Sequence, residues 1–492
     1  MGLNHIVFSP GDTVAILLEP ANAGDVIEWD DEKITLFSGA PQGFKIALKD
    51  VEEGAEILKY GEPLGVATRT ILRGEVVHSH NLKSALTGEL HVPPWERPLS
   101  PEPLLEEPQG GTFFGYRRQN GRVGIRNELW IIPTVGCING LLRGLIQDYP
   151  KPRWISAVRV LEHPWGCSQL GDDLDNTRKV LAGLAHNPNA AGVLVAAMGC
   201  ENLQLDSMVP LLRDVPNLAS LTMQQEKNEK EAVWGYLNEL AEKVERDRVK
   251  CPLSDLVVAV KCGGSDAFSS ITANPLLGHV TDRITFSGGT VMMGEIPEMF
   301  GAEKGLFARC ASEDVHEKLA RALRSFREYF MRHQQPVFEN PSPGNKAGGI
   351  STLEEKSLGA VSKSGRSIVT DVLAYGEVYA KSGLNVVYSP GNDLVSCTAM
   401  AAAGAGMILF STGRGTPFGT VVPTVKIGTN RDLAVQKPRW IDFDASPVIT
   451  EGMRGPAQRL MDQIVEIAEG KEARNEENHI AEISIFKDGV IL

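Results

Sequence analysis

The segment LVVAVKCGGSD, residues 256–266, shows the pattern that decides the fold of this 492-residue chain. Its five apolar residues, 256–260, predict a short buried strand, and the glycines that follow predict a tight loop at the carboxyl end of that strand. The same succession of apolar run, polar loop and helical segment recurs from about residue 113 to the C-terminus. This alternation predicts an α/β fold with a mainly parallel sheet and helices on both faces.

The other segments of this alternation can be given by residue number. Within the segment 314–333, Val315, Leu319, Phe326 and Phe330 fall on one helical face, which we interpret as core. The predicted strands are residues 129–134, 155–161, 193–197, 256–260, 284–286, 385–388 and 407–410, and the predicted helices are residues 172–185, 224–247, 314–333 and 456–469.

The chain divides into four regions by composition. Residues 1–92 predict a small all-β domain, because short apolar runs alternate there with single glycines. Six prolines in VPPWERPLSPEPLLEEPQGG, residues 92–111, predict a semi-extended linker over residues 93–112. A slight change of composition near residue 250 then separates a middle α/β region, 113–250, from a C-terminal region, 251–492.

Charge and composition argue against several classes of function. The net charge of −13 disfavours nucleic acid as a partner, because phosphate binding needs a basic patch. No membrane contact is expected, because the longest small or apolar run, residues 399–410, is shorter than the roughly 20 residues of a membrane span. The N-terminus lacks the pattern of a secretory signal. Seven cysteines, an odd number, suit a reducing cytoplasm better than a disulfide framework.

Four cysteines follow predicted strands directly. Cys137, Cys167, Cys200 and Cys262 each stand just beyond the carboxyl end of an apolar run. Because ligands of open α/β sheets bind at that edge, we expect these side chains to converge there. Thiolates are good ligands for iron and zinc. The alternative is that these cysteines pack as small apolar residues, an interpretation that we prefer for the remaining three cysteines.

Two further strand ends run into polar, glycine-rich loops, SPGND at 389–393 and STGRGTPFG at 411–419. The second loop could hold an anion with its backbone amides and with Arg414, since arginine binds carboxylates in a bidentate manner. Its glycine spacing matches no nucleotide-binding motif, so no nucleotide cofactor is predicted. The candidate residues are Gly391, Asn392, Thr412, Arg414 and Thr416 for substrate binding and Asp393 for catalysis.

Residues 339–359, ENPSPGNKAGGISTLEEKSLG, contain five glycines and lack a periodic apolar face. We predict a loop that forms part of a binding site, with Asn345 and Lys346 as candidate contacts, because long loops without structure of their own are often functional. The alternative is an ordered surface loop.

His78 and His80, in the sequence HSHN, alternate along a predicted strand and are therefore expected to face the same side. Two such histidines could bind a metal or transfer protons at neutral pH. The alternative is a solvated surface at the end of the strand.

Several long segments carry a resemblance to a known family. The segments GRVGIRNELWIIPTVGCING, KCGGSDAFSSITANPLLG, ENPSPGNKAGGISTLEEKSLG and FSTGRGTPFGTVVPTVKI closely resemble the altronate dehydratase family, which belongs with the galactarate dehydratases and the sulfolactate sulfo-lyases. The resemblance extends from Lys59 to the terminal FKDGVIL, and HSHN matches the altronate branch. One departure is Pro164-Trp165, where the resemblance leads us to expect Thr-Tyr.

The resemblance implies an architecture and an activity. The architecture is an N-terminal β-clip domain of the SAF type, a linker, a middle region that contributes to a homodimer, and a C-terminal Rossmann-like sheet. The activity is dehydration of D-altronate to 2-dehydro-3-deoxy-D-gluconate, with iron and reducing conditions required. The alternatives are dehydration of another sugar acid such as galactarate, elimination from a sulfo-sugar acid, and a protein that binds sugar acids without catalysis.

The resemblance also suggests roles for the candidate residues. We expect iron, as Fe²⁺ or else as an iron–sulfur cluster, with Mn²⁺ left open, to be the electrophile. Its ligands would come from the four strand-end cysteines, and Asp266 or Glu339 would replace them if the cysteines fail. Lys346 and Arg414 would hold the substrate carboxylate. His78 or His80 would act as base or acid, with Asp393 as the other candidate.

Overall fold

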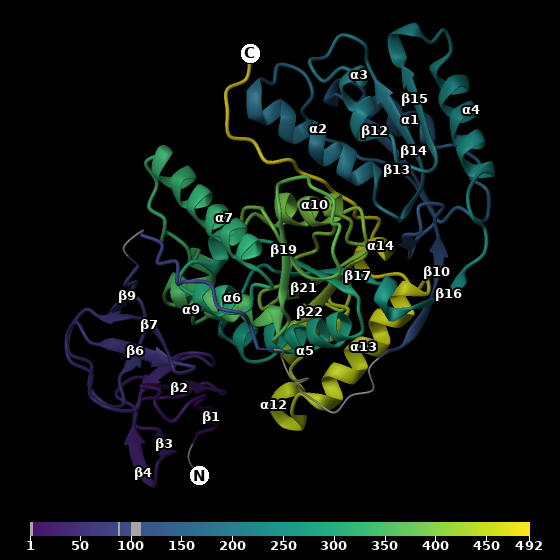
Figure 1. Ribbon diagram of the computed structural model, residues 1–492. Helices are drawn as coiled ribbons and strands as arrows, with labels where there is room; N and C mark the ends of the chain where they lie inside the picture. The colour runs from purple at the N-terminus through teal and green to yellow at the C-terminus, as the bar shows by residue number, and fades with distance from the viewer. Residues whose placement is uncertain (1–2, 87–88, 100–109) are drawn as a thin grey trace.

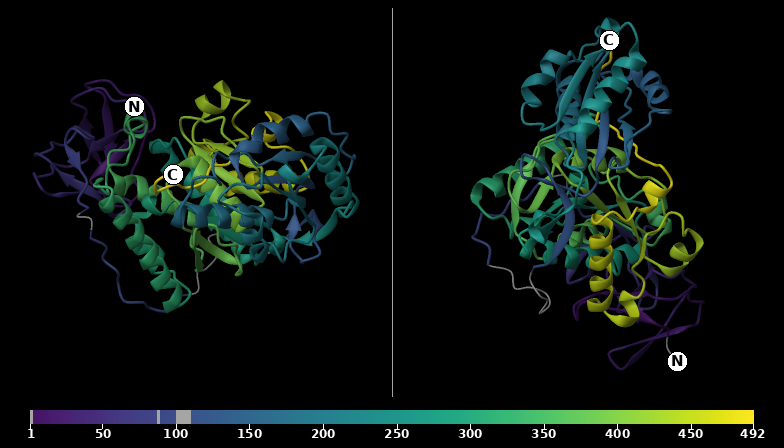
Figure 2. Two further views of the ribbon diagram at one scale, coloured as in Figure 1. Left: turned by 90° about the horizontal axis from the view of Figure 1, so that it is seen from above. Right: turned by 90° about the vertical axis from the view of Figure 1, so that its right-hand side faces the viewer.

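The order of the domains in space differs from their order in the sequence. The computed structural model describes residues 3–86, 89–99 and 110–492. The C-terminal domain lies between the N-terminal domain and the middle domain, which stand at opposite ends of the molecule (Figure 1; Figure 2). The chain therefore passes along the C-terminal domain on its way from the first domain to the second (Figure 1).

The N-terminal domain consists of short antiparallel strands, which confirms the predicted all-β fold. The strands form three small sheets, in the orders β1-β2-β5-β8, β6-β7-β9 and β3-β4. Two apolar clusters fill the domain, one around Ile57 and Leu64 and one around Ile27 and Ile46. The bounds are β1 His5–Ile6, β2 Val14–Leu17, β3 Val26–Trp29, β4 Glu32–Thr35, β5 Lys45–Ala47, β6 Glu56–Lys59, β7 Glu62–Ala67, β8 Val76–Val77 and β9 Leu82–Lys83.

The middle domain is built on a parallel sheet of four strands, in the order β13-β12-β14-β15. A second, antiparallel sheet of order β11-β10-β16 joins it to the C-terminal domain. The bounds are β10 Thr112–Arg117, β11 Val123–Gly124, β12 Glu128–Pro133, α1 Asn139–Ile146, β13 Val158–Val160, α2 Gly171–Ala185, β14 Ala190–Ala197, α3 Leu205–Met208, β15 Leu218–Thr222, α4 Glu229–Glu242 and β16 Val249–Pro252.

The C-terminal domain is organised by a parallel sheet of seven strands, in the order β19-β20-β18-β17-β21-β22-β23. The strands are β17 Val257–Cys262, β18 Thr290–Met293, β19 Val369–Leu373, β20 Gly383–Val387, β21 Met407–Thr412, β22 Thr424–Gly428 and β23 Phe443–Asp444. The helices are α5 Ala273–Phe286, α6 Glu303–Phe307, α7 Glu313–Arg332, α8 Pro343–Ala347, α9 Leu353–Val361, α10 Asp393–Ala403, α11 Arg431–Gln436, α12 Val448–Glu451, α13 Arg454–Ala468 and α14 Arg474–Glu477.

Both faces of this sheet are covered, because alternate residues of β17 enter different apolar clusters. Val258 and Val260 pack in the cluster that contains α5 and α13, whereas Val257 and Ala259 pack in the cluster that contains α10. The second cluster continues into the middle domain through α2 and Trp130. The two α/β domains therefore share one core. None of the helices in the described part of the chain has the length and apolar content needed to cross a membrane.

Two predicted elements differ from the observed ones. Residues 284–286, predicted as a strand, are the last turn of α5, and the strand follows at β18. Apolar residues of three positions do not distinguish the two structures, so the prediction was wrong there. Residues 339–359 are not one loop either, because they contain α8 and most of α9. Ser342 and Thr352 cap these helices with their hydroxyl groups.

The proline-rich segment packs along the C-terminal domain over residues 93–99. Val92 and Trp95 contact the core cluster of that domain, and Trp95 Nε1 donates to the carbonyl of Cys310 at 3.1 Å. Residues 100–109 of the predicted linker lie outside the described residues, and regular structure resumes at Thr112. The described part of this segment is therefore fixed by side-chain contacts.

Candidate active site

A buried cluster of charges lies at the carboxyl end of β17. The Lys261 ammonium contacts the Glu295 carboxylate, Asp393 Oδ1 at 2.8 Å and the carbonyl of Cys262 at 2.8 Å. Burial opposes the charge on Lys261, but Glu295, Asp393 and Glu298 outweigh it and raise its pKa well above the ordinary value. β17 stands between β18 and β21, where the chain switches sides of the sheet. Such a switch point is the usual ligand site of an open parallel sheet.

Glu295 connects two of the lysines from a strained position. It follows β18 with φ 69° and ψ 54°, in the left-handed region that non-glycine residues seldom adopt. Its side chain is 1% exposed, and Oε2 accepts from Lys363 Nζ at 3.1 Å and from the Cys262 amide at 3.3 Å. Strained residues concentrate at functional sites, because the surroundings must hold them in place.

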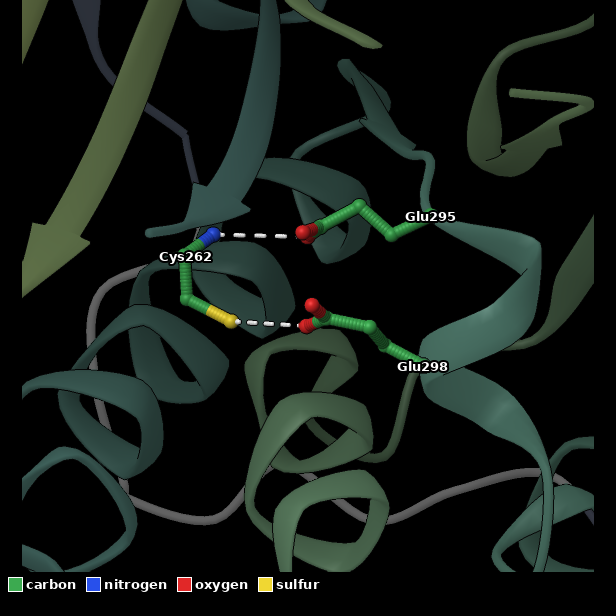
Figure 3. Close-up of side chains that lie close together, drawn as sticks. All are labelled: Cys262, Glu295 and Glu298. Carbon is green, nitrogen blue, oxygen red and sulfur yellow. Dashed lines mark hydrogen bonds between the residues drawn. The ribbon is translucent and has the colours of Figure 1, made fainter. Parts of the chain in front are cut away.

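Cys262 and Glu298 complete the buried part of the cluster (Figure 3). Cys262 Sγ lies 2.8 Å from Lys363 Nζ and 3.5 Å from Glu298 Oε2. Burial raises the pKa of Cys262 to about 11, so the side chain is a thiol at neutral pH. Glu298 also accepts from Lys356 Nζ at 2.8 Å, and Lys356 is 10% exposed. Burial opposes the charge of Lys356, but Glu298 raises its pKa.

Asp393 is the carboxylate through which this cluster reaches solvent. It is the first residue of α10, and its side chain is 32% exposed. A Cβ on Gly263 would lie 2.6 Å from Asp393 Oδ2, so the backbone approach at that position requires glycine. One carboxylate oxygen is thus bound to Lys261, and the residue stands between the buried charges and the outside.

Two predicted cations lie near this region without side-chain partners among the described residues. Arg414 follows β21, with its amide bonded to the carbonyl of Gly264 at 3.0 Å. Its Nε lies 4.0 Å from where a Cβ on Gly344 would stand, so it is next to α8. Lys346 is on α8, and neither side chain forms a hydrogen bond or ion pair within the described ranges. Both cations are therefore available to an anionic ligand.

The other predicted binding residues shape their loops in the structure. Asn345 accepts from Ser342 and donates to the carbonyl of Ser265, and Asn392 caps α10. The hydroxyls of Thr412 and Thr416 accept from amides within their loop, and the Gly391 carbonyl faces Lys261 at 3.4 Å. Direct contact of these residues with a substrate stays a prediction.

The predicted reserve ligands are separate. Asp266 is bonded to Ser269 and Thr429, and burial raises its pKa. Glu339 precedes the capped turn of α8 and belongs to no group of ligand-forming side chains in the described part of the chain.

The N-terminal domain docks on the segment 339–359 through a buried ion triad. Glu355 of α9 accepts from Lys45 Nζ at 2.7 Å and from Lys59 Nζ at 3.1 Å, and all three side chains are almost fully buried. Burial opposes ionisation of Glu355, but the two lysines lower its pKa to about 2. Two helix residues in sequence, Glu355 and Lys356, therefore face the N-terminal domain and the charge cluster respectively.

His78 and His80 lie in a turn after β8, not along a strand as predicted. His78 Nε2 lies 2.9 Å from the carbonyl of Lys346, and its ring stacks on Phe44 at 5.0 Å. Burial and the nearby Lys45 lower the pKa of His78, so its ring is neutral at neutral pH. His80 is exposed and lines the same surface pocket of about 400 Å³. The structure thus brings His78, but not a pair of histidines, to Lys346.

The four strand-end cysteines do not converge on one sheet edge, so that prediction was wrong. Cys137, Cys167 and Cys200 follow strands of the middle sheet and are exposed, whereas Cys262 ends β17 of the C-terminal sheet and is buried. The apolar runs were correctly read as strands, but a sequence cannot say that two separate sheets share them. Cys251, Cys310 and Cys397 are buried, which confirms their interpretation as core.

Sequence reasoning missed most of the charge cluster. Its members Lys261, Glu295, Glu298, Lys356 and Lys363 were not among the predicted site residues. A signal was present in the sequence, because Lys356 and Lys363 are seven residues apart and so lie on one helical face. Lys261 ends an otherwise apolar run, which is an unusual place for a charge.

Comparison with known proteins covers nearly the whole chain. The family description "D-galactarate/Altronate dehydratase, C-terminal" matches residues 253–491, "D-galactarate dehydratase/Altronate hydrolase, second domain" matches 115–246, and "Altronate/galactarate dehydratase SAF domain" matches 3–85. Altronate dehydratase of Bacillus subtilis strain 168 is 44% identical over 98% of both chains. That of Escherichia coli strain K12 is 44% identical over 100% of both. Galactarate dehydratase (L-threo-forming) of the same strain is 33% identical over 94% of this chain and 92% of its own.

Proposed function

The chain belongs to the D-galactarate/altronate dehydratase family, and we propose that it is a hydro-lyase that converts D-altronate to 2-dehydro-3-deoxy-D-gluconate and water. One observation carries the choice of substrate. Two altronate dehydratases share 44% of their residues with this chain over its full length, whereas the galactarate dehydratase shares 33%.

The reaction sets three requirements for the site. The proton on C2, beside the carboxylate, must go to a base, and the hydroxyl on C3 must leave as water with a proton from an acid. The enol that forms then becomes the 2-keto acid by gaining a proton at C3. Positive charge near the carboxylate stabilises the enolate-like transition state, and a site that excludes water strengthens this effect.

Arg414 and Lys346 fit the first contact, with the carboxylate. Both are cations without side-chain partners among the described residues, and both stand at the loops next to Asp393 and α8. Arginine can bind a carboxylate through two parallel hydrogen bonds. We assign these two residues to the substrate carboxylate and the neighbouring loops around Asn345, Asn392 and Thr412 to its hydroxyl groups.

Asp393 is our candidate for the base. Its carboxylate is exposed enough to meet a ligand, and the Lys261 ammonium at 2.8 Å holds it in place. We assign the acid to His80, which is exposed in the turn that His78 fixes against Lys346. His78 is then a positioning residue, because its neutral ring is bonded to the Lys346 carbonyl and to Ser79.

A metal ion does not fit the buried cluster as it stands. Cys262, Glu295 and Glu298 are the only three metal-binding side chains of the described residues whose ligand atoms lie within 4.8 Å of one another. Their charges are already balanced by Lys261, Lys356 and Lys363, and Lys363 occupies the space beside the sulfur. A cation there would have to displace a lysine, so we assign no step of the reaction to a metal at this position.

The function can be tested directly with the purified chain. We expect D-altronate to yield a 2-keto acid and water, with galactarate and other sugar acids turned over at lower kcat/KM. Faster turnover of galactarate would reassign the substrate, and binding of altronate without turnover would indicate a sugar-acid binding protein. We further propose that the enzyme is a cytoplasmic homodimer, a proposal supported by the seven unpaired cysteines for the compartment and by the family resemblance for the dimer.

A further inference from the structure

Three exposed cysteines on the middle domain have no part in the site above. Cys137, Cys167 and Cys200 are exposed, whereas the other four cysteines of the chain are buried. Free cysteine is among the residue types most often buried, so three exposed thiols in one domain need an explanation. The middle domain is at the opposite end of the molecule from the N-terminal domain, and so from His78 (Figure 2).

The three cysteines stand on loops that lie side by side. They follow β12, β13 and β14, which are neighbours in the order β13-β12-β14 and are all parallel. The Gly136 amide donates to the carbonyl of Trp165 at 2.9 Å, which joins the loops of Cys137 and Cys167. The Leu203 amide donates to the carbonyl of Gly166 at 2.9 Å, which joins the loops of Cys167 and Cys200.

Buried polar side chains fix these loops to one another. Glu201, 3% exposed, accepts from the Thr134 hydroxyl and from the amides of Met198 and Gly199. Burial opposes its charge, but these hydrogen bonds lower its pKa. Asn202 accepts from the Ser168 amide at 2.7 Å, beside Cys167. Ligand-bearing loops of metal sites are typically held by such outer contacts.

A second tie passes through His163. Nε2 of His163 lies 2.8 Å from the carbonyl of Pro133, and Nδ1 accepts from the Trp165 amide. Asn139, two residues after Cys137, donates to the carbonyl of His163 at 2.9 Å. The three thiols are thus carried by a rigid edge, not by free surface loops.

The spacing of the sulfur atoms decides which metal centre fits. Around a single zinc ion with Zn–S bonds of about 2.3 Å, three thiolates would lie within roughly 4 Å of one another. The three sulfur atoms are not all within 4.8 Å of one another, because the only such group of the described residues is Cys262, Glu295 and Glu298. A cluster of several irons bridged by sulfide needs cysteines that are further apart, and thiolates are its usual ligands.

We propose that Cys137, Cys167 and Cys200 bind a 4Fe–4S cluster in which one iron has no cysteine ligand. Each thiol loses its proton when it binds iron, and the fourth iron faces solvent, because all three cysteines are exposed. This site is independent of the proposed dehydration, since its residues belong to another domain and another sheet.

The proposal can be tested by metal analysis of the full chain. The protein is purified without oxygen, supplied with ferrous iron and sulfide, and desalted. We expect about four irons and four sulfides per chain, with the visible absorption of an iron–sulfur cluster. Cys137→Ser, Cys167→Ser and Cys200→Ser should each lose most of the iron and the absorption. Cys310→Ser, which changes a buried thiol of the C-terminal domain, is the matched control and should retain both.

A second measurement does not depend on variants that fold. Alkylation of the unsubstituted chain is compared before and after it is supplied with iron and sulfide, and the modified cysteines are identified by mass spectrometry. We expect Cys137, Cys167 and Cys200 to react in the metal-free chain and to be protected in the loaded one. Equal reaction in both forms, or zinc bound without sulfide, would overturn the proposal. No sugar acid is present, so the outcome does not depend on the dehydratase assignment.

Discussion

Lys261 is the residue on which the charge balance of the candidate active site depends. Its ammonium is fully buried and contacts both Glu295 and Asp393. Removing one partner of a buried ion pair costs about 3–5 kcal/mol, because the other charge is left without compensation. Lys261 is therefore a positioning residue for Asp393 rather than a group that meets the substrate.

Asp393→Asn should abolish most of the turnover and leave binding almost unchanged. The amide keeps the size of the side chain and cannot accept the C2 proton, and loss of a general base lowers kcat by about 10²–10⁴-fold. The measurement is steady-state kinetics with D-altronate. Asp206→Asn, on an exposed residue of the middle domain, is the control, and equal kcat in both variants would remove Asp393 from the mechanism.

Arg414→Gln and Lys346→Met should mainly weaken substrate binding. Each change removes a cation that has no side-chain partner among the described residues, so the fold should be little affected. A charged hydrogen bond contributes about 1.5–3 kcal/mol, and we therefore expect KM to rise by roughly 10–100-fold. Unchanged KM with unchanged kcat in both variants would show that the carboxylate binds elsewhere.

His163 should make the stability of the middle domain depend on pH. Burial lowers its pKa from the ordinary 6.5 to about 4, because the ring must stay neutral to accept from the Trp165 amide. The unfolded chain takes up the proton first, so stability is fully present above pH 6.5 and falls as the pH drops toward 4. The loss over this range is about 3 kcal/mol.

Denaturant unfolding followed by tryptophan fluorescence measures this effect. His163→Gln should lack the component of the pH dependence between 6.5 and about 4. His91→Gln, on an exposed residue, should retain it. A pH dependence that is identical in all three proteins would contradict the assignment.

At this scale the sequence predicted the residues that carry free charge better than those that are paired. Lys346, Arg414 and Asp393 were found because they lie in polar loops after apolar runs. Glu295 and Glu298 were missed because each owes its place to a lysine distant in the sequence. A pairing of that kind has no local pattern.

Among the elements, α9 has the largest number of roles. It carries Glu355 toward the N-terminal domain and Lys356 toward the charge cluster, and Lys363 follows shortly after its end. Its first turn is capped by Thr352, whose hydroxyl donates to the carbonyl of Leu64. A displacement of the N-terminal domain would therefore act on the catalytic centre through this helix.

Glu355→Gln should release the N-terminal domain from α9. The change leaves Lys45 and Lys59 buried without a counter-charge, at a cost of about 3–5 kcal/mol. We expect faster hydrogen exchange in β5, β6 and α9 and a parallel fall in turnover. Glu317→Gln, on the exposed side of α7, should alter neither.

The pH dependence of this docking has a defined direction. The pKa of Glu355 is lowered to about 2 in the folded chain, so its contribution is complete above the ordinary value of 4.5 and disappears as the pH falls toward 2. Docking that weakened on going from acid to neutral pH would contradict the triad.

The elements themselves were mostly predictable, and the exceptions have physical reasons. Long segments such as 172–185 and 314–333 gave helices within a residue or two of the observed α2 and α7. Residues 339–359 were read as a loop because the buried face of α9 is polar. Glu354 and Glu355 are buried there, so the usual contrast of apolar and polar faces is absent.

In the whole molecule, the two α/β domains act as one body because α2 packs on α10 in a common apolar cluster. The N-terminal domain contributes no residue to that cluster and is held by its own contacts. Motion of the N-terminal domain relative to the rest is therefore the least costly rearrangement that the architecture allows.

The purified chain should be a dimer in solution. The family resemblance implies contacts through the middle domain, and light scattering should then give twice the mass of the chain. A mass of one chain at every concentration tested would contradict the prediction. If the dimer forms, Phe114 and Val249, which are about half exposed on the sheet of β10 and β16, are the first residues to examine at its interface.

The close approach at Gly263 also constrains how the sequence can vary in evolution. No side chain can be placed there without meeting the carboxylate of Asp393, and at Gly413 a Cβ would lie 2.3 Å from Asp266 Oδ1. A Cβ on Gly11 or Gly54 would meet no atom within 4 Å. In an alignment of dehydratases that keep this centre, the first two positions should be invariant glycines. The last two should drift freely, although all four are the same residue here.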